Sequence, residues 1–196
     1  GFASYCDVNH AIGTGNGFDA LYIALKALGI GINDEVIVPV NSFIASALAV
    51  THCGATPVFA DCASDNFSLD VSLLPSLITK KTKAICLVSP NNPSGVEYPD
   101  AVLNAFYQLA KDHDLTLIID ETYKDFHSNP KRPHSLLDAP DWKQHLVQLY
   151  SFSKAYRMTG HRVGAIINCC YYRRQFFVVC FPVSAFGVLN KLINMS

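Results

Sequence analysis

The chain has 196 residues, enough for one domain with its own hydrophobic core and short for two full domains. Its 15 basic and 16 acidic residues give a formal net charge of −1, so no strong field attracts it to nucleic acid or to an anionic membrane. The composition, 50% hydrophobic and 16% charged, excludes intrinsic disorder. We therefore expect a folded domain with no nucleic-acid and no membrane partner.

The cysteine pattern and the N-terminal residues indicate in which cellular compartment the protein is expected. The seven cysteines are scattered and contain no C-x-x-C pair, which argues against a disulfide framework and against a zinc ribbon. A reducing compartment fits best, so we expect a cytoplasmic protein without a metal site. No signal peptide is recognisable, and because residue 1 is not Met we expect a start that has been cut. The most apolar stretch, 176–189, is too short to cross a bilayer.

Helical and strand patterns alternate from residue 11 onward, which is typical of α/β units around a largely parallel sheet. The first helix is predicted from apolar residues at helical spacing between Phe18 and Leu28, with Gly29 placed as a C-terminal cap. Pro99 suits the first turn of a later helix. Strands are predicted at 35–39, 56–60, 83–88, 115–119 and 145–150, helices near 42–53, 70–79 and 99–113, and a polar loop at 127–141.

Polar residues follow several of these strands. Asn92 lies in the turn-rich segment 89–95, Asp120 and Tyr123 follow the strand 115–119, and Ser151, Lys154 and Arg162 follow the strand 145–150. Ligands bind at this carboxyl edge in open α/β sheets. Taken singly, each residue has an ordinary explanation as a turn former, a helix cap or a surface charge. Their combination favours one site.

The glycine-rich segment Gly13–Gly17 opens a predicted helix but does not have the spacing G-x-G-x-x-G. Its free backbone N–H groups at a helix N-terminus would suit a single phosphate. A plain glycine turn capped by Asn16 is the structural alternative, and a dinucleotide-binding domain is the weakest interpretation. The chain contains no G-x-S-x-G, H-E-x-x-H or G-x-x-x-x-G-K-[ST] motif.

Three segments carry a family resemblance. Ser151–Gly164 (SFSKAYRMTGHRVG) resembles the cofactor-lysine segment of class I/II aminotransferases, which are pyridoxal-phosphate enzymes of fold type I. Ser89–Gly95 (SPNNPSG) and Asp120–Tyr123 (DETY) resemble two further signatures of that family, in the same order. This resemblance covers residues 84–168. It implies a three-layer α/β/α sandwich with a mostly parallel mixed sheet over residues 1–168, the small C-terminal domain missing, and an apolar tail at 169–196.

The resemblance also implies roles around the cofactor, pyridoxal 5'-phosphate. Lys154 would form the Schiff base with the cofactor aldehyde and later move the α-proton, which requires an amine of depressed pKa. Asp120 would keep the pyridine nitrogen protonated, so that the ring accepts the electrons of the substrate carbanion. Asn92 and Tyr123 would hydrogen-bond the ring 3-oxygen.

At the phosphate end of the cofactor, the same resemblance assigns Ser151 and Arg162, the arginine as a fork-like donor. Ser153 is a weaker candidate for this role.

The first part of the chain resembles another branch of the same fold, the DegT/DnrJ/EryC1/StrS sugar aminotransferases. The similarity extends over residues 3–83 and is carried by the segments 9–21, 31–43 and 54–59. It implies that Gly15 and Asn16 contact the cofactor phosphate and that Phe43 stacks on the ring. The structural alternative for Phe43 is ordinary core packing.

These resemblances predict an aminotransferase large domain that moves an amino group between an amino acid and a 2-oxo acid through Lys154. The amino-acid interpretation is favoured because Lys154, Asp120 and Asn92 all lie in the class I/II-like half. Two alternatives stay open: a DegT-type enzyme acting on a keto-sugar, and a truncated or hybrid fragment that binds the cofactor without catalysis. A homodimer is expected, since the family builds its active site across a dimer interface.

Overall fold

The computed structural model describes residues 1–64 and 67–167, which form one seven-stranded sheet in the order β1–β7–β6–β5–β4–β2–β3. Strand β7 runs antiparallel to both of its neighbours, and the other pairs are parallel. This confirms the mostly parallel mixed sheet. The strands are β1 (Ala11–Thr14), β2 (Glu35–Pro39), β3 (Thr56–Ala60), β4 (Thr82–Val88), β5 (Thr116–Asp120), β6 (Leu146–Ser151) and β7 (Gly164–Ile167).

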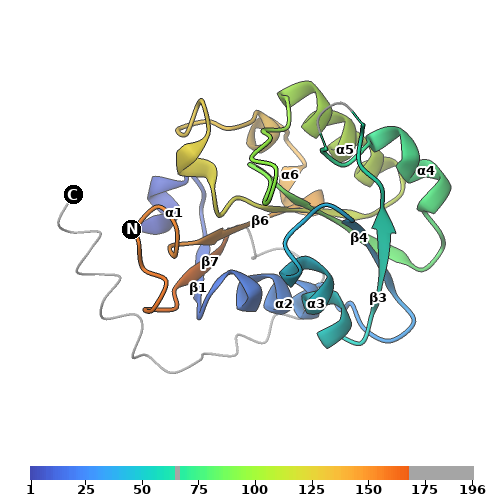
Figure 1. Ribbon diagram of the computed structural model, residues 1–196, viewed down its shortest axis with the longest axis horizontal. Coiled ribbons are helices and arrows are strands. Elements are labelled where there is room, and N and C mark those ends of the chain that lie inside the picture. The colour runs from blue at the N-terminus through green and yellow to red at the C-terminus, as the bar shows by residue number, and fades with distance from the viewer. Residues whose placement is uncertain (65–66, 168–196) are drawn as a thin grey trace.

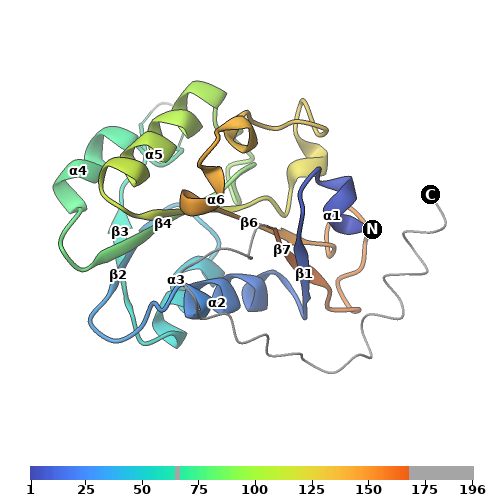
Figure 2. The same ribbon diagram turned by 180° about the vertical axis from the view of Figure 1, so that it is seen from behind.

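Helices cover both faces of the sheet, as Figures 1 and 2 show. The helices α2 and α3 lie on one face, and α4, α5 and α6 lie on the other. The expected three-layer α/β/α sandwich is therefore confirmed. The helices are α1 (Phe2–Tyr5), α2 (Gly17–Ala27), α3 (Ala45–His52), α4 (Leu74–Leu77), α5 (Asp100–Asp112) and α6 (Trp142–His145), with 3-10 turns at Val71–Leu73, Lys124–Phe126 and Leu136–Asp138.

A hydrophobic core lies between the sheet and each of the two helix layers. Because successive side chains of a strand point to opposite faces, Val36 and Val38 of β2 pack in the core with Leu25 of α2. Ile37, between them, packs in the other core with Phe106 of α5. The central strands are buried on both faces, which explains their continuous apolar runs.

Helix α2 forms as the sequence predicts. The Asn16 side chain caps it by accepting a hydrogen bond from the Asp19 N–H at 3.1 Å. At the other end, Gly29 has φ +76°, the left-handed conformation that ends helices and that glycine adopts without strain. The cap fixes where α2 begins, directly after the glycine-rich turn.

Other parts differ from the predicted elements. The segment 70–79 is two short turns instead of one helix, and Ile78 is already extended. Pro75 is the second residue of α4 and has no N–H to bond to the preceding turn. Pro99 is the N-cap of α5 and lies just before its first turn. The fold also contains α1, α6, the edge strand β1 and β7, each four residues long, which the sequence patterns did not predict.

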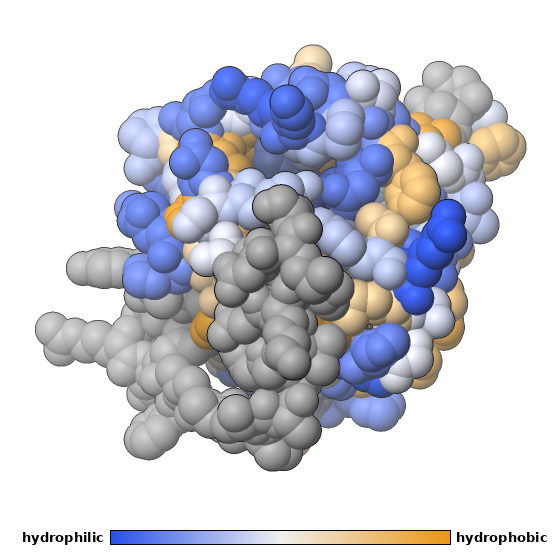
Figure 3. All heavy atoms as spheres, turned by 90° about the vertical axis from the view of Figure 1, so that its left-hand side faces the viewer, coloured by the Kyte–Doolittle hydropathy of each residue, from blue (hydrophilic) through white to orange (hydrophobic). Residues whose placement is uncertain are grey.

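Figure 3 views the side of the molecule that carries α1, where polar and apolar side chains are interspersed on the coloured part of the surface. In the part of the chain that the structure describes, no helix combines the length and the hydropathy needed to span a membrane. The cysteines in that part are free. The tail predicted at 169–196 lies outside the described residues.

Candidate active site

Three loops that follow adjacent parallel strands bring their polar side chains together. Asn92 comes after β4, Tyr123 after β5 and Lys154 after β6. The Asn92 Nδ2 donates a hydrogen bond to the Tyr123 hydroxyl at 3.3 Å. The Lys154 Nζ lies 5.8 Å from the centroid of the Tyr123 ring. Residues 31 and 62 positions from Asn92 in sequence thus share one edge of the sheet, as predicted.

Asp120 is the last residue of β5, and only one of its two carboxylate oxygens accepts hydrogen bonds from the described residues. Its Oδ1 accepts hydrogen bonds from the Thr122 N–H at 2.9 Å and the Thr122 hydroxyl at 2.6 Å. Its Oδ2 accepts none from the described residues. Burial raises the pKa of Asp120, against the lowering effect of the Thr122 hydrogen bonds. Such an oxygen fits a cationic N–H donor, as a protonated pyridine nitrogen would be.

The N-terminus of α2 meets the end of β6. A Cβ on Gly17 would lie 3.3 Å from the Ser151 Cβ, so the two backbones approach closely. The Ser151 hydroxyl donates to the Ser153 Oγ at 3.1 Å, and both residues are buried. The first N–H groups of a helix have no partner within it and attract anions. This junction fits a phosphate group.

The predicted phosphate contacts Gly15 and Asn16 lie at this junction. The Asn16 side chain is committed to Asp19, since its Nδ2 donates to the Asp19 Oδ2 at 2.7 Å. A Cβ on Gly15 would lie 2.4 Å from the same oxygen, so a larger residue there would displace the Asp19 carboxylate. The backbone N–H groups are therefore the donors that these residues can offer a phosphate.

Arg162 lies on the segment between the Lys154 turn and β7. Its guanidinium is exposed and donates to the Thr159 carbonyl at 3.2 Å. Two residues on, Gly164 is paired with Ser151 across the β6–β7 ladder. No described contact joins the Arg162 side chain to Ser151 or to α2, so its phosphate role stays a prediction.

Phe43 follows β2 and is 57% exposed. This exposure rules out the alternative of ordinary core packing, while the stacking role stays a prediction. The loop that carries Phe43 is tied to the Asn92 loop, because the Asn91 Nδ2 donates to the Asn41 carbonyl at 3.2 Å. The loop after β2 therefore lies beside the loop after β4.

The structure adds residues that sequence analysis missed. An open pocket of about 520 Å³ is lined by Tyr123, Phe126, Ser153, Lys154, Arg157 and Thr159. Of these, Phe126, Arg157 and Thr159 were not predicted as site residues. Arg157 and Thr159 lie inside the segment that carried the family resemblance, so their proximity to Lys154 was a usable signal.

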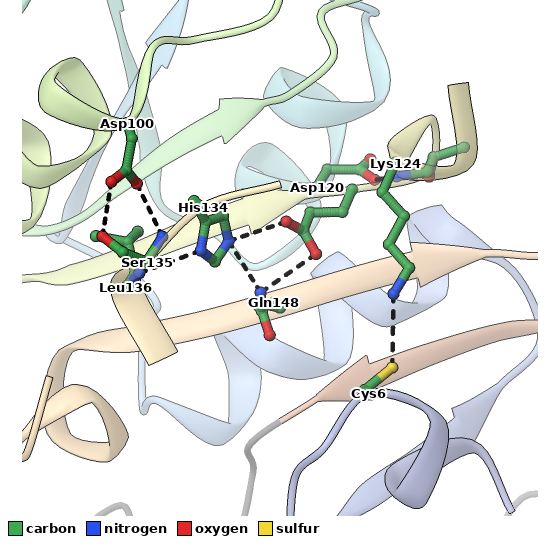
Figure 4. A network of polar contacts seen from close by, with 10 residues as sticks. Cys6, Asp100, Asp120, Lys124, His134, Ser135, Leu136 and Gln148 are labelled. Atoms are coloured by element: carbon green, nitrogen blue, oxygen red, sulfur yellow. Dashed lines mark hydrogen bonds and ion pairs between the residues drawn. The ribbon is translucent and has the colours of Figure 1, made fainter. Parts of the chain in front are cut away.

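A buried polar network that includes His134 and Gln148, shown in Figure 4, holds the residue after Asp120. This residue, Glu121, contacts the His134 Nε2 at 2.9 Å and accepts from the Gln148 amide at 3.2 Å. The Leu136 N–H donates to the His134 Nδ1 at 3.3 Å, so the Nε2 carries the ring proton and donates to Glu121. The network ties the end of β5 to β6 and to the loop after β5.

Lys124 is a second lysine close in sequence to Asp120, but its side chain has another environment. It is buried, and its Nζ lies 3.7 Å from the Cys6 Sγ and 5.0 Å from the centroid of the Tyr5 ring. Lys154 is the lysine that lines the pocket. Among the described residues, no group of three or more His, Cys, Asp or Glu side chains could hold a metal ion.

The model of the DegT/DnrJ/EryC1/StrS aminotransferase family matches residues 1–122. The match extends beyond residue 83, where sequence analysis placed the end of this resemblance, and includes Asn92 and Asp120.

Individual relatives and structures agree with the family model. The chain is 45% identical over 119 residues to GDP-perosamine synthase of Caulobacter vibrioides, covering 61% of this chain and 30% of that protein. It is 33% identical over 199 residues to the putative aminotransferase YugH of Bacillus subtilis, covering 97% and 51%. The crystal structure of an aromatic aminotransferase from Pyrococcus horikoshii matches with a TM-score of 0.73 and 28% identity, over 80% of this chain and 42% of that one.

The chain thus spans about half the length of YugH and less of the other two proteins. The family model covers more than half of the chain, and the fold superposes on a solved aminotransferase with a TM-score of 0.73. The chain belongs to the DegT/DnrJ/EryC1/StrS aminotransferase family and has the fold type I architecture of pyridoxal-phosphate aminotransferases.

Proposed function

We propose that the chain is the cofactor-binding large domain of an aminotransferase that moves an amino group between an amino acid and a 2-oxo acid at Lys154. One observation carries the proposal: the loops after β4, β5 and β6 bring Asn92, Tyr123 and Lys154 together, and Asp120, at the end of β5, has an oxygen that accepts no hydrogen bond from the described residues. An amine, a hydroxyl and a free carboxylate oxygen at the same edge of the sheet are the groups this chemistry needs.

Pyridoxal phosphate, when bound, supplies an aldehyde and an electron-accepting ring. Lys154 would offer the amine for the aldehyde and, when free, would hold and move a proton. Asp120 would accept a hydrogen bond from the ring nitrogen and so favour its charged form. Tyr123 and Asn92, already hydrogen-bonded to each other, would orient the ring oxygen.

The phosphate would bind where α2 begins. The first turn of α2, whose leading N–H groups have no partner within the helix, lies against Ser151 at the α2–β6 junction. Arg162 would add a fork of donors from the segment before β7. This end of the site anchors the cofactor and takes no part in proton transfer.

A keto-sugar is the second candidate for the amino acceptor. The family model over residues 1–122 and the 45% identity to GDP-perosamine synthase favour it. The two acceptors are separated by incubating the loaded protein with an amino donor and either pyruvate or a nucleotide-linked keto-sugar, and following the aminated product.

We also propose a cytoplasmic homodimer. Val40, Phe43 and Ile44 are exposed apolar residues next to the site, as expected of a face that a second subunit covers. The free cysteines of the described ranges fit a reducing compartment. Sedimentation of the chain with and without cofactor tests the dimer.

The test of the proposed function is attachment of the cofactor. The chain is incubated with pyridoxal phosphate, reduced with borohydride and mapped by mass spectrometry. We expect a visible absorption band that borohydride removes and a pyridoxyl label on Lys154. Label spread over surface lysines such as Lys143, or no band, would overturn the proposal and leave a fragment without a working site. Attachment without turnover would support the non-catalytic alternative.

A further inference from the structure

Arg157 lies in the same turn as Lys154 and faces the same pocket. The Arg157 N–H donates to the Lys154 carbonyl at 3.1 Å, which closes the turn, and both side chains line the 520 Å³ pocket. The lining residues include these two cations and no carboxylate. The pocket is therefore positively charged at its wall.

The Arg157 side chain is exposed and has no partner among residues 1–64 and 67–167. No ion pair or side-chain hydrogen bond reaches its guanidinium there. The other two arginines of the described ranges are both bound: Arg132 pairs with Asp138, and Arg162 donates to the Thr159 carbonyl. An unpaired guanidinium at the wall of a candidate active site is available to a ligand.

The backbone at Arg157 gives a second, independent reason. Its φ of +52° lies in the left-handed region, where a side chain is disfavoured and glycine is not. Backbone conformations of this kind are concentrated at ligand-binding sites. An arginine at this position carries a conformational cost that glycine would avoid, and it places a cation in the pocket.

We infer that Arg157 is a specificity-determining residue that binds an anionic group of the substrate distant from the reacting carbon. The planar guanidinium forms paired hydrogen bonds with a carboxylate or a phosphate. Phe126 and Tyr123, on the same wall, contact the apolar part of the ligand. The inference rests on the proposed function and adds the substrate class: an acidic amino acid or oxo acid, or a diphosphate-linked keto-sugar.

The experiment compares the chain with Arg157→Gly, Arg157→Lys and the matched control Arg132→Ala, which removes an exposed arginine outside the pocket. Glycine removes the guanidinium and relieves the left-handed backbone, so this variant should fold at least as well as the parent chain. Binding of succinate, neutral succinamide and dTDP is measured by calorimetry, with and without pyridoxal phosphate. Cofactor affinity is measured on the same samples by absorption.

We expect succinate or dTDP to bind the parent chain and to bind Arg157→Gly about tenfold more weakly, the loss expected for one charge-assisted hydrogen-bond pair. The lysine variant should be intermediate, while Arg132→Ala and the cofactor affinity should be unchanged. The tighter of the two anions identifies the carboxylate or the diphosphate class.

Three results would overturn the inference: no binding of either anion, equal binding by Arg157→Gly and the parent, or a loss of cofactor affinity in Arg157→Gly, which would assign the arginine to the cofactor phosphate. Failure of the proposed function has a separate signature, because the borohydride label on Lys154 would then be absent whatever the anions do.

Discussion

The end of β5 and the turn after β6 both supply residues to the candidate site, but they hold them differently. Behind Asp120, Glu121 is bound to His134 and Gln148, all of them buried. In the turn after β6, by contrast, the side chains of Lys154 and Arg157 are exposed. Buried packing therefore holds the end of β5, where Asp120 is proposed to receive the cofactor ring, whereas the Lys154 amine and the Arg157 guanidinium are exposed to ligands.

This contrast predicts that changes in the turn after β6 remove chemistry without changing stability, and that changes in the buried network around Glu121 mainly lower stability. The largest expected effect is at Lys154. Lys154→Ala should abolish the borohydride-trapped label completely. Its free energy of unfolding should change by no more than about 0.5 kcal/mol, because the side chain is exposed. A Lys154→Ala variant that keeps the label, or that unfolds much more readily, would contradict the contrast between the two regions.

The second prediction concerns the buried side of the comparison. His134→Ala removes the partner of Glu121 and leaves a buried carboxylate with one bond fewer, because the His134 side chain is 2% exposed. We expect a loss of about 3 kcal/mol in urea unfolding. His113→Ala, at the exposed end of α5, is the matched control and should stay within about 0.5 kcal/mol of the parent. Equal stability of the two variants would contradict a supporting role for the network.

A smaller loss of stability is expected for a substitution where β7 contacts the start of α2. A Cβ on Gly164 would lie 2.6 Å from the Asn16 carbonyl carbon and 2.7 Å from the Thr14 hydroxyl, so backbone must move. Gly164→Ala should destabilise the chain by about 2 kcal/mol and weaken cofactor binding at the start of α2. At Gly160, a Cβ would meet nothing within 4 Å, so Gly160→Ala should be neutral in the same thermal melts. A neutral Gly164→Ala would show that this junction is loose.

The smallest effect, and the one with a pH signature, is at Asp120. Burial raises the pKa of the Asp120 carboxyl in the folded state. The charge therefore lowers the free energy of unfolding. This loss is absent below the pKa of the unfolded state and grows as the pH rises from there to the folded-state pKa. In Asp120→Asn, the side-chain amide oxygen would keep the two Thr122 hydrogen bonds, both of which go to Oδ1, and the group would carry no charge. Asp120→Asn should therefore be about 1 kcal/mol more stable at neutral pH.

That gain should vanish toward about pH 3, where aspartate is protonated in both states. Cofactor affinity should fall in the same variant. Urea unfolding across the pH range checks the first expectation and absorption titration checks the second. A pH-independent difference in stability would mean that the charge of Asp120 has no part in it.

Long amphipathic and apolar patterns made much of the fold predictable. The strands 35–39 and 56–60 were predicted with their observed bounds, and α2 was found from its apolar spacing and Gly29. Elements of four residues, such as β1 and α6, are too short to show a repeating apolar pattern. At 70–79 the apolar residues suggested one helix, but Pro75 interrupts it.

The site was predictable where residues directly follow strands. Asp120 ends β5 and Tyr123 follows it, and the Asn92–Tyr123 hydrogen bond bears out the predicted proximity of the loops after β4 and β5. The buried network around Glu121 was not predictable. His134 lies in a polar loop, and only tertiary packing brings it into contact with Gln148, which is 14 residues away in sequence. Arg157 had a local signal, its distance of three residues from Lys154, but its left-handed backbone is visible only in the structure.

The most direct test of the central claim is a crystal structure of the chain after reduction with pyridoxal phosphate and borohydride. We expect the pyridoxyl group on Lys154, its ring nitrogen within hydrogen-bond distance of the Asp120 Oδ2, and its phosphate at the N-terminus of α2 beside Ser151. A cofactor attached to Lys154 with its ring nitrogen directed to solvent, or with its phosphate away from α2, would contradict the assignment of these residues.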